Sequence, residues 1–205
     1  MIKPLLSFFI FFAFPQLLDQ QKTVSDLTIT YSVDNSQASS KTDLSSASKI
    51  IYLRGKQIRI DLNSNSFNQT IFYNGNTEEA TVLKSIGDSK YISSYSAQQW
   101  KTENSVYNDL KISYTGNTKK LLNYDCKEAI LELKNGTKYS VYYVPEIMPS
   151  VTENDFQFKT VPGLVLQYQT TIRNEKVEYT ATKINFDPVP AFHFEIPKSG
   201  YKILN

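Results

Sequence analysis

Residues 49–76 read KIIYLRGKQIRIDLNSNSFNQTIFYNGN, and they contain three short runs in which apolar and polar side chains alternate. Isoleucine, tyrosine, phenylalanine and threonine are frequent in these runs, and such residue types favour strands. Turn-forming residues follow the first and third runs, namely Gly55 and the pair Asn74-Gly75. The segment therefore predicts three strands, 49–54, 57–63 and 67–73, that pair as antiparallel neighbours.

The same alternation continues along the rest of the chain. The sequence has 14 tyrosines and 12 phenylalanines against 7 glycines, and the aromatic residues fall in short runs between Asn, Ser, Gly and Lys. The pair Asn135-Gly136 marks the clearest hairpin, because this dipeptide tolerates the positive φ angles of a type I′ turn. The further predicted strands are 27–33, 80–86, 90–95, 110–115, 128–134, 138–144, 164–171 and 177–186.

Two segments lack this period of two. Residues 96–110 read SAQQWKTENSVYNDL and predict a helix with Trp100, Val106 and Tyr107 roughly on one face. Residues 32–49 are rich in serine and predict a loop between the first two strands.

The predicted fold is mainly β, a single domain over residues 23–205 that consists of antiparallel sheet with one or two helices. A chain of this length can bury one sizeable core. In the strands of residues 51–62 and 139–144, the outward positions still carry Tyr or Ile. Either a second layer covers that face of the sheet, or the sheet curls around something.

The first 22 residues have the layout of a signal peptide. Lys3 precedes an apolar block, Leu5 to Phe14, that is too short for the ~20 residues of a membrane-spanning helix. We therefore expect a periplasmic or secreted protein without an integral membrane span. No A-x-A cleavage triplet follows, so a retained N-terminal anchor stays open as the alternative. No cysteine follows the block either, which argues against a lipid-anchored protein.

Charge and cysteine content narrow the function classes. The net charge is +2 and the pI about 8.4, with basic and acidic residues interspersed, so nucleic acid is not an expected partner. Cys126 is the one cysteine and His193 the one histidine, so an intrachain disulfide and the usual zinc ligand sets are excluded. We expect Cys126 to be buried; a nucleophilic thiol is the alternative.

A search for catalytic motifs in the sequence finds few candidates. The dispersed glycines form no phosphate-binding loop. We therefore expect no cofactor, no metal and no enzymatic activity. A hydrolase that uses dispersed carboxylates stays open as a minor alternative, because only their spatial separation would identify them.

The second half of the chain resembles a family of exported proteins. YTGNTKKLLNYDCKEAILELKNGTKYSVYYVPEI (114–147), VPGLVLQYQT (161–170) and FHFEIPKSGYKIL (192–204) are similar, in order and spacing, to GLPGLI and DUF4412-type proteins of Bacteroidetes. These proteins are grouped with the lipoprotein carriers and receptors typified by LolA and LolB. The chain departs from the pattern at Asn123, where glycine is frequent, and at Val161, which replaces leucine. The matching residues are Gly116, Thr118, Lys119, Tyr124, Cys126, Pro162, Gly163, Leu164, Pro197, Gly200, Tyr201 and Lys202.

The resemblance implies a LolA-like fold, a strongly curved antiparallel sheet that forms an incomplete barrel, with helices closing its apolar concave face. Arg54 is the residue nearest to an arginine that in LolA helps to lock the closed cavity. A surface charge beside a turn is the alternative for Arg54.

Together these features predict a non-enzymatic envelope protein that binds an apolar ligand, a lipid or acyl chain, or a lipid-bearing partner. Trp100, Tyr107, Leu164 and Leu166 are expected to line its cavity, although as ordinary core residues they would need no ligand. The alternative function is an envelope protein–protein interaction module with a filled core, and an exposed aromatic patch would favour it.

Overall fold

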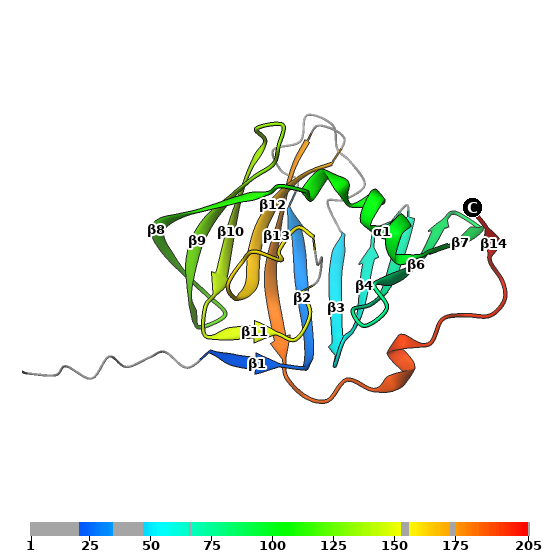
Figure 1. Cartoon of the computed structure of the whole chain (residues 1–205). Coiled ribbons are helices and arrows are strands. Elements are labelled where there is room, and N and C mark those ends of the chain that lie inside the picture. The colour runs from blue at the N-terminus through cyan, green and yellow to red at the C-terminus, as the bar shows by residue number, and fades with distance from the viewer. Residues whose placement is uncertain (1–20, 35–46, 66, 153–155, 173–174, 205) are drawn as a thin grey trace, which may run out of the picture.

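The computed structural model describes residues 21–34, 47–65, 67–152, 156–172 and 175–204. In this part of the chain, twelve strands form one large sheet in the order β14-β7-β6-β5-β4-β3-β2-β13-β12-β10-β9-β8, and β1 and β11 form a small second sheet (Figure 1). The prediction of a mainly β fold is therefore confirmed. The large sheet is curved and is not closed into a barrel. The strands of the large sheet are β2 Asp26–Asp34, β3 Ser48–Arg54, β4 Gln57–Asn63, β5 Phe67–Asn74, β6 Glu79–Ile86, β7 Ser89–Tyr95, β8 Lys111–Leu121, β9 Tyr124–Glu132, β10 Lys138–Val144, β12 Leu164–Ile172, β13 Glu175–Asn185 and β14 Lys202–Ile203.

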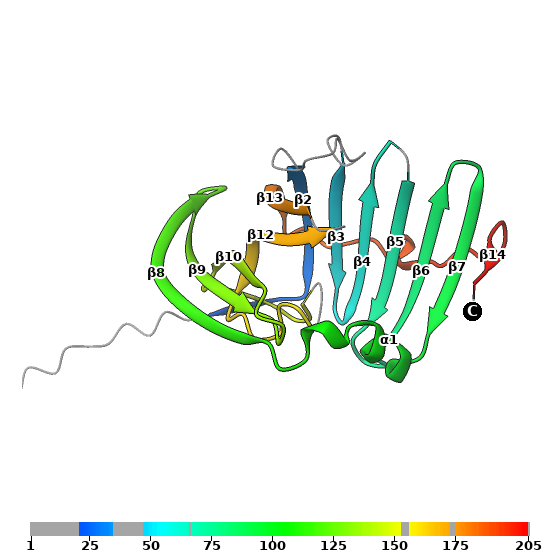
Figure 2. The ribbon, with the colours of Figure 1, turned by 90° about the horizontal axis from the view of Figure 1, so that it is seen from above.

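The large sheet consists of two meanders joined in its middle. Strands β2 to β7 follow one another on one side, and β8, β9, β10, β12 and β13 follow one another on the other. The last long strand, β13, returns to pair with the first, β2, in antiparallel register. The helix α1, Ala97–Glu103, and the 3-10 helix η1, Ser105–Tyr107, connect β7 to β8. The half of the sheet that contains β8 and β9 is the more strongly curved one in Figure 2.

The concave face of the sheet carries the core. Because alternate residues of a strand point to one face, the register that pairs Ile29 with Ile51 and Ile51 with Ile60 aligns apolar side chains across β2, β3 and β4. On the other meander, Ala129, Val141 and Leu166 are wholly buried. The two halves of the curved sheet therefore share one core.

The C-terminal segment covers part of the convex face (Figures 1 and 2). The 3-10 helix η2, Ala191–Phe194, packs on β4, and the ring of His193 stacks on Tyr52 with centroids 4.3 Å apart. Arg59 donates from Nη1 to the carbonyl oxygen of His193 at 2.9 Å. Both alternatives raised by the outward apolar residues thus apply: the sheet curls, and a second layer covers Tyr52.

The turn at Asn135-Gly136 differs from the prediction. The hairpin between β9 and β10 is confirmed, since Glu132 pairs with Lys138. The type I′ turn is wrong: Gly136 has φ 84° but Asn135 is not left-handed, and the Gly136 amide donates to the Leu133 carbonyl at 2.9 Å. This is the geometry of a longer loop with a glycine after a type I turn.

A type I′ turn occurs instead between β8 and β9. Leu122 and Asn123 both have positive φ, 47° and 68°, and connect the paired residues Leu121 and Tyr124. Asparagine is one of the few residues that adopt this conformation readily. A turn at Leu122 and Asn123 was not predicted from the sequence.

Several predicted boundaries change. The predicted helix 96–110 ends at Glu103, and Val106 is 52% exposed, so the expected helical face of Trp100, Val106 and Tyr107 does not form as one face. The strand predicted at 110–115 extends to Leu121 through a bulge between Tyr114 and Thr118. The strands β1, Lys22–Val24, and β11, Ile147–Pro149, were not predicted; they pair in parallel.

Two predictions fall mostly outside the described residues. The signal peptide 1–22 lies outside them except for Gln21 and Lys22. Of the predicted loop 32–49 only the ends are described: residues 32–34 belong to β2, Ala47 precedes β3, and Ser48 and Lys49 belong to β3. Within the described residues, no helix is both long and apolar enough to cross a membrane.

Candidate functional site

A cavity of about 210 Å³ lies between the concave face of the sheet and helix α1. Strands β3, β4, β5 and β13 and the segment between β11 and β12 supply its wall, and α1 with the residue that ends it supplies its cover. A water molecule takes about 30 Å³, so this cavity holds about seven water-sized groups. The lining residues are Lys49, Ile60, Leu62, Gln69, Ile71, Tyr73, Trp100, Asn104, Gln157 and Tyr179.

The apolar wall of the cavity follows from strand register. Ile60 pairs with Ile71 and Leu62 pairs with Gln69 across β4 and β5, so these side chains share one face of the sheet. Their sequence neighbours Arg59 and Asp61 point to the opposite, convex face, where they form an ion pair at 2.9 Å. The alternation of QIRIDLN thus separates an apolar cavity wall from a charged pair on the other side.

Helix α1 is fixed over the cavity at both of its ends. Ser96 caps the first turn: its hydroxyl accepts from the Gln99 amide, and the Gln99 side chain accepts from the Ser96 amide at 2.9 Å. At the other end, the buried Asn104 donates from Nδ2 to the carbonyl oxygen of Trp100 at 2.8 Å. Trp100 itself packs against Tyr95 at the end of β7, with ring centroids 5.5 Å apart. These contacts hold the indole ring at the cavity.

The polar end of the cavity is a lysine among tyrosines. Lys49 is 8% exposed and donates from Nζ to the hydroxyl of Tyr168 at 2.6 Å. Its Nζ lies 5.1 Å from the ring centroids of Tyr168 and Tyr179 and 5.9 Å from that of Tyr31. Distances of this size allow the ring faces to attract an ammonium group.

Burial controls the protonation of this cluster. It lowers the pKa of Lys49 to about 7, because removal from water disfavours the charged amine. It raises the pKa of Tyr179 to about 12 and the pKa values of Tyr31 and Tyr168 as well, because it disfavours the phenolate. The three tyrosines are therefore neutral at physiological pH, and the lysine is the one group of the four whose charge changes near pH 7.

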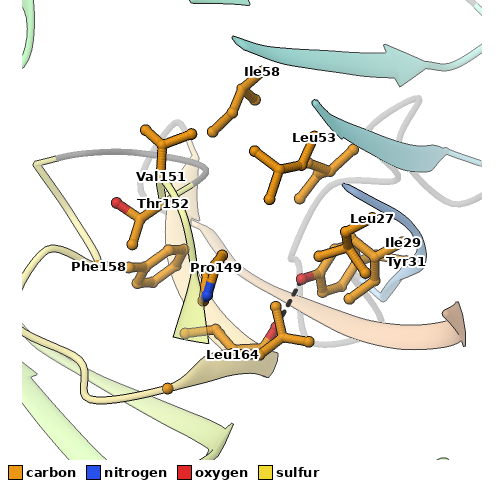
Figure 3. A pocket seen from close by; sticks show the side chains of 13 residues that line it. Leu27, Ile29, Tyr31, Leu53, Ile58, Pro149, Val151, Thr152, Phe158 and Leu164 are labelled. Atoms are coloured by element: carbon orange, nitrogen blue, oxygen red, sulfur yellow. Dashed lines mark hydrogen bonds between the residues drawn. The ribbon is translucent and has the colours of Figure 1, made fainter. Parts of the chain in front are cut away.

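A second cavity, of about 30 Å³, lies under the segment that connects β10 to β12 (Figure 3). Figure 3 shows side chains from β2 and β3, including Leu27, Ile29 and Leu53, facing Phe158 and Leu164. The hydroxyl of Tyr31 donates to the carbonyl oxygen of Val165 at 2.7 Å at its edge. The space suffices for only about one water-sized group, so this region is packed core rather than a ligand site.

The structure distributes the predicted site residues over different places. Trp100 lines the larger cavity, and Leu164 lines the smaller one. Leu166 is wholly buried in the core and lines neither. Tyr107 is half-buried in η1, outside both linings, and Arg54 is exposed at the end of β3, beside the Gly55 turn.

The sequence analysis missed Lys49, Asn104 and Tyr179. Lys49 had a readable signal: it stands in phase with Ile51 and Leu53, whose side chains are buried on the concave face. A lysine in the apolar phase of a strand is unusual, because lysine is almost never fully buried without a partner group. Tyr179 lies in VEYTATKINF, where the alternation alone did not distinguish it from core.

Cys126 is wholly buried, which confirms the expected burial. Burial raises the pKa of its thiol to about 11, although hydrogen bonding with the backbone at Leu121 opposes this. The thiol is therefore protonated at neutral pH, whereas a nucleophile must be a thiolate. Within the described residues, no three His, Cys, Asp or Glu side chains lie together so that they could hold a metal ion.

Carboxylates on the convex face form a hydrogen-bonded network rather than an open pair. Glu128 accepts from Thr115, Asn117 and Ser140 at 2.6–2.8 Å. Burial raises the pKa of Glu128, but the hydrogen bonds outweigh it and the net pKa is lowered. Glu178 accepts from the amide of Gln167 at 2.6 Å. Neither glutamate lines either cavity, so the network has the features of a structural element.

No protein-family model and no curated protein matches the sequence. The chain is similar in fold to two solved structures of PNGF-II, one in a C2 and one in a P21 space group, with a TM-score of 0.51 for each. The sequence identities are 16% and 15%, over 87% and 88% of this chain but only 30% and 32% of the PNGF-II chain. The chain thus spans about a third of PNGF-II, and at this identity the similarity concerns the fold alone.

Proposed function

We propose that the protein binds a small apolar or amphipathic molecule non-covalently in the 210 Å³ cavity under α1, without enzymatic turnover. The observation that carries this proposal is the cavity itself: an apolar wall of Ile60, Leu62 and Ile71 faces a covering indole and leaves unfilled space between them. Ligand sites are concave and mostly apolar, with a few polar groups that fix orientation. The polar groups of this lining belong to Lys49, Gln69, Tyr73, Asn104, Gln157 and Tyr179.

Burial of hydrocarbon would supply the affinity. Each methylene removed from water contributes about 0.8 kcal/mol. About six buried methylenes would therefore contribute about 5 kcal/mol, which corresponds to sub-millimolar dissociation before the cost of association is subtracted. Such binding is reversible and suits a carrier or a receptor.

The LolA-like character and the location outside the cytoplasm belong to the same proposal. A curved, open antiparallel sheet with a helix on its concave side supports the first. The apolar block that begins at Leu5, preceded by Lys3, supports the second. In this setting the ligand would be a lipid or acyl chain, either free or attached to a protein.

Native mass spectrometry with organic extraction tests the proposal. The chain from Gln21 onward would be purified after export into a bacterial periplasm; this start keeps the hydrogen bond from the Gln21 side chain to the Pro145 carbonyl, 2.8 Å, and the strand β1. We expect a stoichiometric lipid or fatty acid. Trp100→Ala should weaken its retention about tenfold or more, by loss of apolar contact. Phe192→Ala, on the convex side and 61% exposed, is the matched control and should retain the ligand.

A protein–protein interaction module is the second candidate function. The observation that favours it is a group of exposed apolar side chains on the C-terminal segment: Phe192, Ile196, Ile203 and Leu204 are 42–76% exposed. Exposed apolar surface of this kind can mark a binding face for a protein. A ligand-free mass, with no uptake of added fatty acid, phospholipid or acylated peptide, would refute the first candidate and favour this one.

A further inference from the structure

We infer that the protein has a second binding site, a groove on the convex side of the sheet that takes a compact alkylammonium ion. The groove has a volume of about 190 Å³. Strands β4, β5 and β6 form one side of it, and Phe194 of η2 with the following Ile196 forms the other. The inference goes beyond the proposed function, since it concerns a different site and a different class of ligand.

A row of polar side chains crosses three strands at one rim of this convex groove. Gln57 pairs with Asn74 across β4 and β5, and Asn74 pairs with Glu79 across β5 and β6. Residues that pair directly across strands have their side chains on the same face of the sheet. The row therefore presents one carboxylate and two amides, and the oxygens of all three groups accept hydrogen bonds.

The rest of the convex groove is largely hydrocarbon. Phe72 lies two residues along β5 from Asn74, so it shares the face of the polar row, and it is only 7% exposed. Phe194 and Ile196 line the groove from the C-terminal segment. A ligand here contacts hydrogen-bond acceptors at one end and apolar side chains at the other, which suits an amphipathic molecule.

The charges around the convex groove favour a cation. Glu79 is the one charged residue of its lining. Segments 72–81 and 190–196, which carry most of the lining, also contain Glu78 and Glu195 but no lysine or arginine. None of the ion pairs among the described residues involves Glu79. An ammonium group in the groove would therefore meet an excess of negative charge and a carboxylate that has no basic partner in the described part of the chain.

Two basic residues adjoin the convex groove, and both have partners elsewhere. Arg59 on β4 donates to Asp61 at 2.9 Å and to the backbone of η2 at 2.9 Å. Lys56, in the turn before β4, donates from Nζ to the carbonyl oxygen of Ser150. Neither residue lines the groove, so neither competes with a ligand for Glu79.

The volume of the convex groove limits the size of the ligand. At about 30 Å³ for each water-sized group, the space holds about six such groups, which matches one ammonium nitrogen and five carbons. An ammonium nitrogen has three N–H donors, and the polar row offers acceptors on three side chains. A free alkylamine and the side chain of a lysine in a peptide both carry this group.

An NMR titration of the ¹⁵N-labelled chain from Gln21 onward tests the inference with three probes of matched size: pentylammonium, pentan-1-ol and pentanoate. We expect pentylammonium to shift the amide signals of residues 74–81 and 194–196 saturably, and to bind there about five times more tightly than the alcohol, as an exposed ion pair allows. Pentanoate should not bind there. Glu79→Gln should remove the preference for the ammonium ion. Glu103→Gln, which removes an exposed carboxylate at the end of α1, is the matched control.

The outcomes are distinct. Equal binding of pentylammonium and pentan-1-ol, or a preference that Glu79→Gln leaves intact, would overturn the inference. Shifts confined to residues 100–104 would also overturn it, because they would place the probe at α1 instead. In about 1 M sodium chloride the preference of the unaltered chain should decline, since salt screens exposed charges. Nα-acetyl-lysine N-methylamide separates the two sources: binding as tight as that of pentylammonium indicates a lysine of a peptide, and weaker binding indicates a free amine.

Discussion

The Nζ atom of Lys49 reaches the hydroxyl of Tyr168 at 2.6 Å, although the two residues are 119 positions apart and belong to strands that are not neighbours. Strand β3 is separated from β12 by β2 and β13. In a flat sheet three strand spacings amount to about 14 Å, and side chains on one face stand roughly parallel. The curl of the sheet therefore brings the two side chains together and creates the polar end of the cavity.

The first prediction concerns pH and stability. Because the pKa of Lys49 is lowered in the folded state, the unfolded chain binds a proton that the folded chain lacks between pH 7 and 10.5. The free energy of unfolding should therefore rise with pH in this window, by at most about 1.4 kcal/mol per pH unit, and this lysine should contribute no pH dependence well below pH 7.

Urea denaturation at several pH values between 7 and 9.5 measures this slope. Above about pH 10 the tyrosines act in the opposite direction, since those of the unfolded chain ionise first. Lys49→Met should lose the rise, and Lys134→Met, whose side chain is 82% exposed, should retain it. Parallel slopes for the unaltered chain and Lys49→Met would contradict a lowered pKa at this lysine.

The second prediction concerns the C-terminal cover. Arg59 links η2 to the sheet, because it donates to the carbonyl oxygen of His193 and to the carboxylate of Asp61. Asp61 accepts from Arg59 Nε at 2.9 and 3.0 Å and from the Thr70 hydroxyl at 2.7 Å. Arg59→Leu should leave the buried Asp61 without its cation, lower the free energy of unfolding by about 2–4 kcal/mol and increase amide exchange in residues 188–196. Arg54→Leu is the matched control.

Hydrogen–deuterium exchange with mass spectrometry follows the cover directly. Arg54 is exposed beside a turn, so its substitution should change neither exchange nor ligand binding. An effect of Arg54→Leu on ligand retention would favour the locking role that the LolA resemblance implies for this residue. Unchanged exchange in Arg59→Leu would refute the role of Arg59 as the tether.

The third prediction concerns Gly163. An added Cβ at this glycine would overlap the carbonyl oxygen of Val144 and lie 2.8 Å from Cδ2 of Tyr143. Gly163→Ala should therefore destabilise the protein by about 1–3 kcal/mol or more, through displacement of β10. Gly116→Ala is the control for backbone conformation. Gly116 has φ 80°, but an added Cβ would meet no other atom, so this substitution should lower the free energy of unfolding by only about 1–2 kcal/mol. Thermal unfolding that ranks Gly116→Ala as the more harmful change would contradict this account.

The fourth prediction concerns the cap of α1. Ser96→Ala removes the hydroxyl that accepts from the Gln99 amide and should cost about 1 kcal/mol of stability. Because α1 holds Trp100 over the cavity, the substitution should also shift the tryptophan emission to longer wavelength. Thr102→Ala, which removes only a hydrogen bond to the Gln98 carbonyl on the exposed side of α1, is the control and should leave emission unchanged. Identical emission spectra for Ser96→Ala and the unaltered chain would show that the cap does not position Trp100.

Periodicity predicted the long strands well, and for a physical reason. The bounds of β4 and β10 coincide with the predicted runs 57–63 and 138–144, because each has one buried face and therefore a period of two. The parallel pairs β1–β11 and β7–β14 span only three and two residues, too few for any period. Their pairing joins segments far apart in the chain, such as Lys22 with Ile147 and Lys202 with Tyr91, and local periodicity carries no signal of such pairs.

The site was predictable in part. Trp100 was identified because it stands in the one polar stretch long enough for a helix. Lys49 was not, although it shares the phase of the buried Ile51, because a lysine at the start of a strand is normally solvated. Leu166 was expected at the cavity and lies in the core, since sequence alone does not separate a residue that lines a cavity from one that fills it.

Fluorescence quenching of Trp100 by a brominated short-chain fatty acid tests the central claim most directly, because the chain has one tryptophan and it lines the proposed site. The account predicts saturable quenching with a stoichiometry of one, which the unlabelled fatty acid reverses by competition. A brominated chain that binds stoichiometrically by calorimetry but leaves the emission of Trp100 unchanged would place the ligand elsewhere and contradict the claim.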